Sequence, residues 1–294
     1  MTNIKKRSEI LFLYDVKNAN PNGDPMDANR PRIDEETGKC LVTDVRLKRT
    51  IRDYLFNKGY NGENGQDIYI REEEGKPVTG AKRSESFTDK DDFISKFIDV
   101  RMFGGVSAPK KSKDSAAKTF NFTGPVQFSM GKTLNVVKEN FIKGTGAFAT
   151  EEGSTQKTFR EEYNISYGLV AFHGVINEYA AEWTKLTEKD VEELIDGMWN
   201  GTKSLLTRSK KGHMPRLLIK LDYAEKGFFI GDLAELITLQ SESEKREEEY
   251  EDIANFMLDV SELNKQLRAH SDKIEKVTII SDERLKLSEE IYQK

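Results

Sequence analysis

The residues best suited to chemistry in this sequence are lysines and arginines that recur in four short clusters. The clusters are Arg46, Lys48, Arg49 and Arg52; Lys110, Lys111 and Lys113; Lys157 and Arg160; and Arg208 and Lys210. Side chains of this kind neutralise phosphate groups and fix the register of a nucleic-acid backbone. Because each cluster falls at the end of an expected element or in a loop, the pattern predicts a binding surface for a polyanion.

A polar loop at residues 18–25, with the sequence NANPNGDP, lies just before the first cluster. Prolines fix the backbone angle φ, and asparagine side chains form local hydrogen bonds, so we expect this loop to hold one shape. We predict that Asn18, Asn20 and Asn22 donate hydrogen bonds to the bound strand. Downstream, Met130, Phe148 and Phe159 are available to contact bases, although packing within the protein explains each of them equally well.

The first cluster lies in a predicted helix over residues 43–55, for which Asp44 is the expected N-cap. At 100° per residue, Leu47 and Ile51 belong to an apolar arc of roughly 100°, and the four cations occupy the opposite half. No glutamate is interleaved with these cations, so the Glu–Lys pairs of an ordinary solvated helix are missing. We therefore expect the apolar arc to dock on a sheet and the basic side to face outward.

Composition restricts the remaining possibilities. The chain has 294 residues and a formal net charge of −5, so a nucleic-acid site must be a local patch on an acidic protein. Cys40 is the single cysteine and the three histidines are widely separated, which argues against a disulfide framework, a zinc site and a histidine metal cluster. We predict no metal, no cofactor and no membrane segment, and a location in the cytoplasm.

Hydrophobic patterning predicts a mixed fold. Residues 9–16 are apolar on both faces, as in a central strand covered on each side. Further strands are expected at 124–130, 165–176, 215–223, 227–231 and 277–280, and helices at 89–100, 187–206 and 253–267. The stretch 131–163 is hydrophilic and dotted with glycine, so we expect it to project from the sheet as an arm. The order favours an α+β fold of the ferredoxin or RNA-recognition-motif kind, enlarged by insertions, with helices on one side of the sheet.

Three alternatives for the site stay open. Asp24 and Asp27, with Asp15 upstream, offer oxygen ligands for a divalent metal that could assist RNA cleavage, although turn formation explains Asp24 and Asp27 better. His213 follows a basic turn and is expected to be a polar surface residue instead of a general base. The acidic run at 242–252 could meet the basic loops of a neighbouring copy in an assembly made of protein alone.

The motif at 9–25, EILFLYDVKNANPNGDP, followed by NRPR at 29–32 and VTDVRLKRTIRD at 42–53, resembles the backbone subunit of type I CRISPR Cascade complexes. The likeness is closest to the subtype I-B and I-C branch of the repeat-associated RNA-binding superfamily. It continues through RMFG at 101–104, TGPVQ at 123–127 and YGLVAFHG at 167–174, so it covers nearly the whole chain.

The resemblance implies one RNA-recognition-type domain over 1–294, with a helical finger or web-like insertion at 56–122 and a β-hairpin thumb at 131–163. In this family, copies polymerise along the guide RNA beside the other Cascade subunits, and each thumb folds over its neighbour to flip a base at regular intervals. A separate helicase-nuclease is recruited to cut. Relatives in type III systems cleave target RNA with an acidic loop residue, which keeps a metal-dependent endoribonuclease using Asp24 as the alternative.

We therefore expect a non-catalytic subunit that binds CRISPR RNA along its backbone and presents the spacer for pairing with target DNA. Because spacers differ from guide to guide, only phosphate and ribose contacts can be shared among them. The helix cluster from Arg46 to Arg52 and the loop asparagines are the principal candidates for these contacts. Arg208 and Lys210 form a second group.

Overall fold

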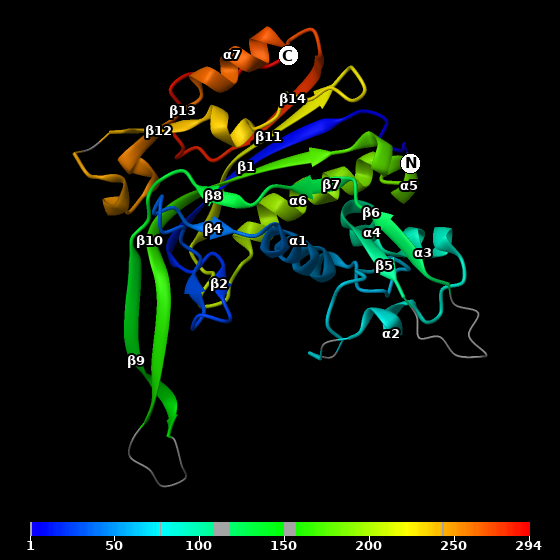
Figure 1. Cartoon of the computed structure of the whole chain (residues 1–294), viewed down its shortest axis with the longest axis horizontal. Helices are drawn as coiled ribbons and strands as arrows, with labels where there is room; N and C mark the ends of the chain where they lie inside the picture. Colours follow the sequence, from blue (N-terminus) through cyan, green and yellow to red (C-terminus); the bar gives the residue numbers. More distant parts are fainter. Residues whose placement is uncertain (1, 74, 77, 109–117, 150–156, 243) are drawn as a thin grey trace.

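A long central strand, β1 (Ser8–Ala19), organises the sheet of this protein. The structure is a computed structural model that describes residues 2–73, 75–76, 78–108, 118–149, 157–242 and 244–294. The eight-stranded sheet has the order β14-β11-β1-β10-β8-β4, and β7 and β9 also pair with β10 (Figure 1). Every pairing in this sheet is antiparallel, and β1 pairs directly with β10 (Lys157–Ile176) and β11 (His213–Tyr223). The other strands of the sheet are β4 (Leu41–Val42), β7 (Val126–Phe128), β8 (Gly131–Thr133), β9 (Glu139–Ala149) and β14 (Ile274–Ser281).

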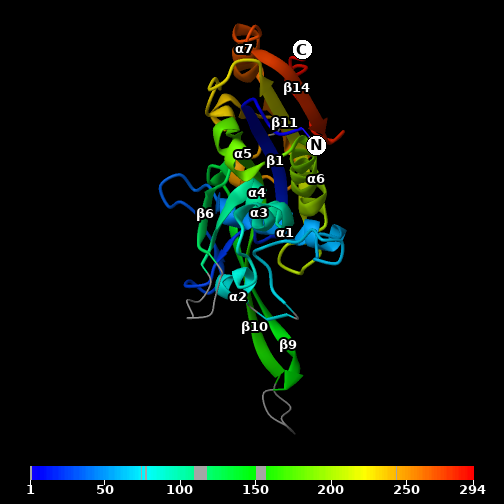
Figure 2. The ribbon, with the colours of Figure 1, turned by 90° about the vertical axis from the view of Figure 1, so that its right-hand side faces the viewer.

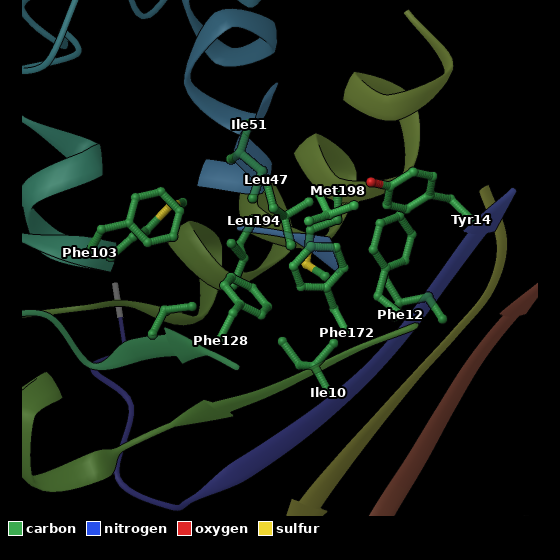
Figure 3. Packing of buried hydrophobic residues seen from close by; sticks show 14 of the residues in the cluster. Ile10, Phe12, Tyr14, Leu47, Ile51, Phe103, Phe128, Phe172, Leu194 and Met198 are labelled. Atoms are coloured by element: carbon green, nitrogen blue, oxygen red, sulfur yellow. The ribbon is translucent and has the colours of Figure 1, made fainter. Parts of the chain in front are cut away.

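Both faces of β1 are buried, as the apolar pattern predicted. Ile10, Phe12 and Tyr14 point into one core with α1 (Asp44–Lys58) and α6 (Glu188–Lys203), as Figure 3 shows. Leu11 and Leu13 point into a second core on the other face. The fold is thus a mixed α/β arrangement built on one main antiparallel sheet.

The helix predicted at 187–206 is confirmed as α6, which begins with a capping box. Thr187 is its N-cap, and the side chains of Thr187 and Asp190 each accept a hydrogen bond from the other's backbone N–H. Glycine lets this helix approach α1 closely, since a Cβ atom on Gly197 would lie 2.9 Å from Cγ2 of Ile51. The short helices α5 (Glu178–Thr184) and α4 (Ile98–Phe103) complete the layer on this face.

The second face is covered by the C-terminal part of the chain. It comprises β12 (Thr238–Ser241), β13 (Phe256–Asp259), α7 (Ser261–Ala269) and three 3-10 helices at Leu233–Leu236, Glu247–Glu249 and Ile253–Asn255. The expectation of helices on one side only is therefore wrong. So are the strand predicted at 227–231, which is irregular backbone, and the start of the helix predicted at 253–267, whose first residues form a 3-10 turn and β13.

A third apolar core lies in the stretch between α1 and β7. Phe93 and Phe97 pack edge to face with ring centroids 5.1 Å apart, and Tyr69 and Val100 complete the buried set. The surrounding elements are α2 (Gly80–Ser84), α3 (Lys90–Lys96), β5 (Gly104–Ser107) and β6 (Phe120–Thr123). The single helix predicted at 89–100 is in fact two, because the backbone is extended at Phe97 between α3 and α4.

The strands β9 and β10 form a hairpin that extends far beyond the sheet (Figures 1 and 2). The hairpin projects as an arm, whereas the first residues of the stretch 131–163 belong to the body of the protein. Thr133 and Val137 are buried, and the backbone N–H of Val137 donates to the carbonyl of Gly38 at 2.9 Å. Among the described helices, none is long and apolar enough to cross a membrane.

Candidate nucleic-acid interface

The polar loop after β1 is fixed to the start of α1. Oδ1 of Asn22 accepts hydrogen bonds from the backbone N–H and the hydroxyl of Thr43, both at 2.8 Å. Thr43, and not Asp44 as predicted, is the N-cap of α1. Asn20 is buried, and its amide donates to the carbonyl of Asn29 at 2.7 Å. These two asparagines therefore hold the loop in shape, whereas Asn18 is exposed in a left-handed conformation with φ 49°.

Arg52 does not face outward as predicted. Its side chain is 9% exposed, and its Nε donates to Oδ2 of Asp99, which is 1% exposed, at 2.9 Å. The guanidinium also lies 5.1 Å from the ring centroid of Phe103. The 100° spacing correctly placed Arg52 on the side of α1 away from the apolar arc, but the segment that carries α4 packs against that side. Arg52 thus joins two parts of the fold.

The other α1 cations have acidic partners within the helix. Nζ of Lys48 lies 2.9 Å from Asp44, and Nε of Arg49 lies 2.6 Å from Asp53, both at i,i+4 spacing. The expectation of an unpaired basic flank is wrong because it considered glutamate and overlooked these aspartates. Arg46 is half-buried and donates to the hydroxyl of Thr50 at 3.1 Å; burial lowers the pKa of Arg46.

The loop between α6 and β11 packs against the loop after β1. Nζ of Lys210 donates to the carbonyl of Pro21 at 3.0 Å and to the carbonyl of Asn20. Burial, together with the positive charge of Arg46, lowers the pKa of Lys210 to about 8. Lys210 is therefore a structural cation that holds these two loops together.

His213 is buried, so the expectation of a surface residue is wrong. Its Nδ1 pairs with the carbonyl of Lys210, and its ring packs 5.6 Å from that of Tyr14. Because a carbonyl oxygen accepts, Nδ1 carries the proton. Burial lowers the pKa of His213 to about 3. The residue is therefore neutral at physiological pH.

Two arginines from separate clusters meet at the root of the hairpin. Arg160 on β10 and Arg208 in the loop between α6 and β11 share Oε2 of Glu162, at 3.0 Å and 3.1 Å respectively. Their side chains remain 38% and 56% exposed. With Asn20 they border a hollow of about 370 Å³. Of the predicted cations whose side chains the structure describes, these two are the best placed to reach a ligand at the edge of the loop.

An aromatic stack on the hairpin was missed in the sequence. Phe141 and Tyr163 are directly opposite each other on β9 and β10, and their ring centroids are 4.7 Å apart. The ammonium of Lys143 lies 5.3 Å from the Phe141 ring, and the guanidinium of Arg30 lies 5.2 Å from the Tyr163 ring. The alternation of side chains along each strand could have indicated which residues share a face of the hairpin. It predicts that Phe141 and Tyr163 lie opposite each other only when the register of the two strands is known.

The acidic residues do not gather into a metal site. Asp15 is buried and accepts from Nε of Arg216 at 2.8 Å, whereas Asp24 lies in the polar loop and pairs with Arg32 at 2.7 Å. Asp27 is exposed at the tip of that loop. Within the described ranges, no three His, Cys, Asp or Glu side chains come together in a way that could hold a metal ion.

Part of the acidic run at 242–252 is used within the same chain. Asp252 pairs with Lys17 at 3.2 Å and with Arg284 at 2.7 Å, and Oε2 of Glu247 accepts from the backbone N–H of Val136 at 2.8 Å. These contacts hold the acidic segment beside the sheet and the base of the hairpin.

Several residues predicted to contact RNA lie outside the part of the chain that the structure describes, or have side chains that it does not describe. Lys110, Lys111 and Lys113 fall within 109–117, which the structure does not describe. The side chain of Lys157 is not described either, nor are those of Phe148 and Phe159. Met130 is described, and it is 55% exposed beside the loop that carries Asp24.

Comparison with known proteins identifies relatives over almost the full length. The family model described as "CRISPR-associated protein Cas7" matches residues 6–261. A protein of that name from Haloferax volcanii is 35% identical over 309 aligned residues, which cover 96% of this chain and 88% of the relative. Among solved structures, a chain of a "CRISPR RNA-guided surveillance complex" has a TM-score of 0.54 at 14% identity and covers 97% of this chain and 95% of its own. A chain of a complex described as "pre-nicking" has a TM-score of 0.52 at 11% identity, with coverage of 97% and 96%.

Proposed function

We propose, from the premise that this chain belongs to the CRISPR-associated Cas7 family, that it is the RNA-binding backbone subunit of a CRISPR RNA-guided surveillance complex. Copies would polymerise along the guide RNA, contact the other Cascade subunits and present the spacer to target DNA, in the cytoplasm. A helicase-nuclease recruited to the complex would then carry out cleavage. The subtype I-B assignment is part of the same proposal.

The observation that carries the proposal is the convergence of Arg160 and Arg208 beside the polar loop at the hairpin root. Two exposed guanidinium groups that share one carboxylate leave donors free for phosphate oxygens. The aromatic pair Phe141 and Tyr163 lies on the same hairpin, where it could stack on exposed bases. None of these contacts requires a particular base sequence, as a subunit that serves every guide needs.

The proposal assigns parts of the fold to the family's architecture. The main sheet with α1 and α6 would be the RNA-recognition-type palm, residues 56–122 the finger or web-like insertion, and the β9–β10 hairpin within residues 131–163 the thumb. The long hairpin and the separate aromatic core of the insertion support these assignments. Asn18, Arg46 and Arg49 remain proposed guide contacts, together with Lys110, Lys111, Lys113 and Lys157. For Lys48, Arg52, Asn20, Asn22 and Lys210, the internal contacts favour a supporting role in shaping the site.

The test is the salt dependence of RNA binding. Replacing both Arg160 and Arg208 with alanine should flatten the slope of log affinity against log salt by about 1.4, since each lost phosphate contact on a single strand accounts for roughly 0.7. The matched control is Lys265→Ala with Arg268→Ala, which removes the same charge from exposed positions on α7. An unchanged slope in the arginine variant would remove the hairpin root from the RNA site.

We also propose that the subunit is not catalytic. The Asp24 carboxylate forms an ion pair with Arg32 and accepts a hydrogen bond from the backbone N–H of Met26 at 3.0 Å. These contacts favour a role of Asp24 in stabilising the turn. Incubation of the purified protein with RNA and Mg²⁺ separates the two functions. Bound, intact RNA supports the backbone subunit, whereas fragments that disappear in Asp24→Ala would establish the endoribonuclease.

A scaffold held together by protein contacts alone is the third possibility. In such a scaffold the acidic run at 242–252 would bind the basic loops of a neighbouring copy. Part of this run already forms ion pairs within the chain, because Asp252 pairs with Lys17 and Arg284. Assemblies isolated from cells should fall apart on treatment with ribonuclease if RNA connects the copies. Assemblies that survive the treatment would favour the protein-only scaffold.

A further inference from the structure

A second surface hollow lies on the opposite flank of α6 from α1, and none of the functions above uses it. It has a volume of about 880 Å³ and runs between α6 and the outermost strands β11 and β14. Its apolar lining includes Ile195 and Trp199 on α6, one turn apart, and Ile280 on β14, all of them half-buried. Ile4 also lines it. This hollow is called the β14 groove below.

The register of the sheet explains why the groove is open. Phe12, Leu218 and Ile280 form one row across β1, β11 and β14, and all three belong to the core that α6 covers. Phe12 and Leu218 are fully buried, whereas Ile280 is only half-buried because no helix of the described structure covers this face of β14. The helical layer therefore ends one helix short of the edge of the sheet.

The two walls of the β14 groove carry opposite charges. On the α6 wall, Glu188 and Glu192 are exposed and lie one turn apart. Opposite it, Lys276 on β14 is exposed, as is Lys5 in the segment before β1, which also lines the groove. Within the described part of the chain, none of these four residues forms an ion pair within 4.0 Å. An occupant with acidic and basic flanks would thus fit in one orientation.

We propose that the β14 groove binds an amphipathic helix from a different subunit of the complex. Its apolar stripe would cover Ile195, Trp199 and Ile280, its basic flank would face α6, and its acidic flank would face the strands. Such a helix would extend the layer formed by α1 and α6 and finish burying the edge of the core. The inference rests on the proposed function, since it requires a complex of several subunits.

A second copy of this chain is a poor occupant. The longer helices in the described structure already bury their apolar faces in their own cores, as Leu47 and Ile51 of α1 and Leu263 and Leu267 of α7 do. An extended segment is the other alternative, and it would add to the free edge of β14 instead of filling the groove.

Site-directed labelling tests the proposal. The variant Thr278→Cys places a thiol in the groove, and the native Cys40 is 0% exposed and leaves little background. Benzophenone maleimide is the probe, applied to the chain bound to guide RNA alone and to the complex isolated from its own cells on a tagged copy. Labelling at position 278 should be at least tenfold slower in the complex. The control Glu262→Cys, which is exposed on α7 on the other face, should label equally in both samples.

Photo-crosslinking of complexes assembled on chain that was labelled beforehand then identifies the occupant. A crosslink to an amphipathic helical segment of another protein supports the proposal. A crosslink to a second copy of this chain, a crosslink to an extended segment, or equal labelling in the two samples would overturn it.

Charge reversal gives a second readout. Replacing Glu188 and Glu192 with lysine should restore labelling of position 278 in the complex at least tenfold, while reversal of Lys189 on the same helix, which does not line the groove, should not. RNA affinity is measured in parallel. If RNA binding and assembly persist while position 278 stays reactive, only this inference fails; if the chain binds no RNA and recovers no partners, the proposed function fails with it.

Discussion

The buried ion pair between Arg52 and Asp99 gives the sharpest prediction. Removing one partner of such a pair costs about 3–5 kcal/mol, because the other charge is left buried and uncompensated. Asp99 would keep two backbone donors, the N–H groups of Tyr69 at 2.7 Å and Ile70 at 3.2 Å. We therefore expect Arg52→Ala to lower the free energy of unfolding by about 3 kcal/mol, at the lower end of that range.

The matched control is Arg49→Ala on the same helix. Arg49 and Asp53 form a half-exposed pair, for which a loss of less than about 1 kcal/mol is expected. Urea unfolding followed by circular dichroism measures both variants, and hydrogen exchange at 67–70 reports on the segment that Asp99 holds. The double variant Arg52→Met with Asp99→Asn should be less destabilised than Arg52→Met alone, because no buried charge remains.

Two results would contradict this account of Arg52. One is a stability of Arg52→Ala equal to that of Arg49→Ala, which would mean that the pair contributes nothing. The other is a flatter salt dependence of RNA binding in folded Arg52→Ala, which would return this residue to the guide contacts.

Three further predictions concern other buried groups. The pKa of folded His213 is about 3, below the ordinary value of 6.5, so the unfolded chain takes up the proton first as the pH falls. The stability that neutral His213 contributes is complete above pH 6.5, and the free energy of unfolding falls by about 1.4 kcal/mol at pH 5.5. Urea midpoints measured at pH 7.5 and 5.5 should show this loss in the native chain but not in His213→Gln. Gly197→Val should destabilise the fold by about 2 kcal/mol in the same assay, because its side chain would overlap Ile51 of α1, and an unchanged midpoint would mean that the two helices separate freely. Burial raises the pKa of Cys40 to about 12. A disulfide reagent at pH 8 should therefore react with Cys40 at least a hundredfold faster in the chain unfolded by urea than in the folded chain. Equal rates would mean that Cys40 is accessible to solvent in the folded chain.

Local signals in the sequence were sufficient for the regular elements. The apolar run at 9–16 predicted a strand covered on both faces, and Thr187 with Asp190 marked the start of α6. These features depend on residues close together in the chain. Predictions of helices and strands failed where tertiary contacts determine the backbone conformation. At Phe97 the helical spacing of apolar residues continues, but the backbone is extended and separates α3 from α4.

The site was harder to predict because burial is not a local property. Arg52 and Arg208 look alike in the sequence, yet the first is covered by a segment 47 residues further along the chain and the second is exposed at a hairpin. The pairing of Phe141 with Tyr163 depends on a register that spans the whole arm. The hydrophilic, glycine-dotted composition of 131–163 indicated an arm, but it carried no information on this register.

The placement of β1 has a consequence for synthesis on the ribosome. Its two neighbours in the sheet, β10 and β11, begin at residues 157 and 213, so the first strand to leave the exit tunnel waits for most of the chain before either edge is paired. During that interval its apolar residues and free backbone groups are open to association with other nascent chains. Translation of consecutive copies on one messenger would bring such strands close together, and slower elongation before residue 213 would lower the yield of native protein.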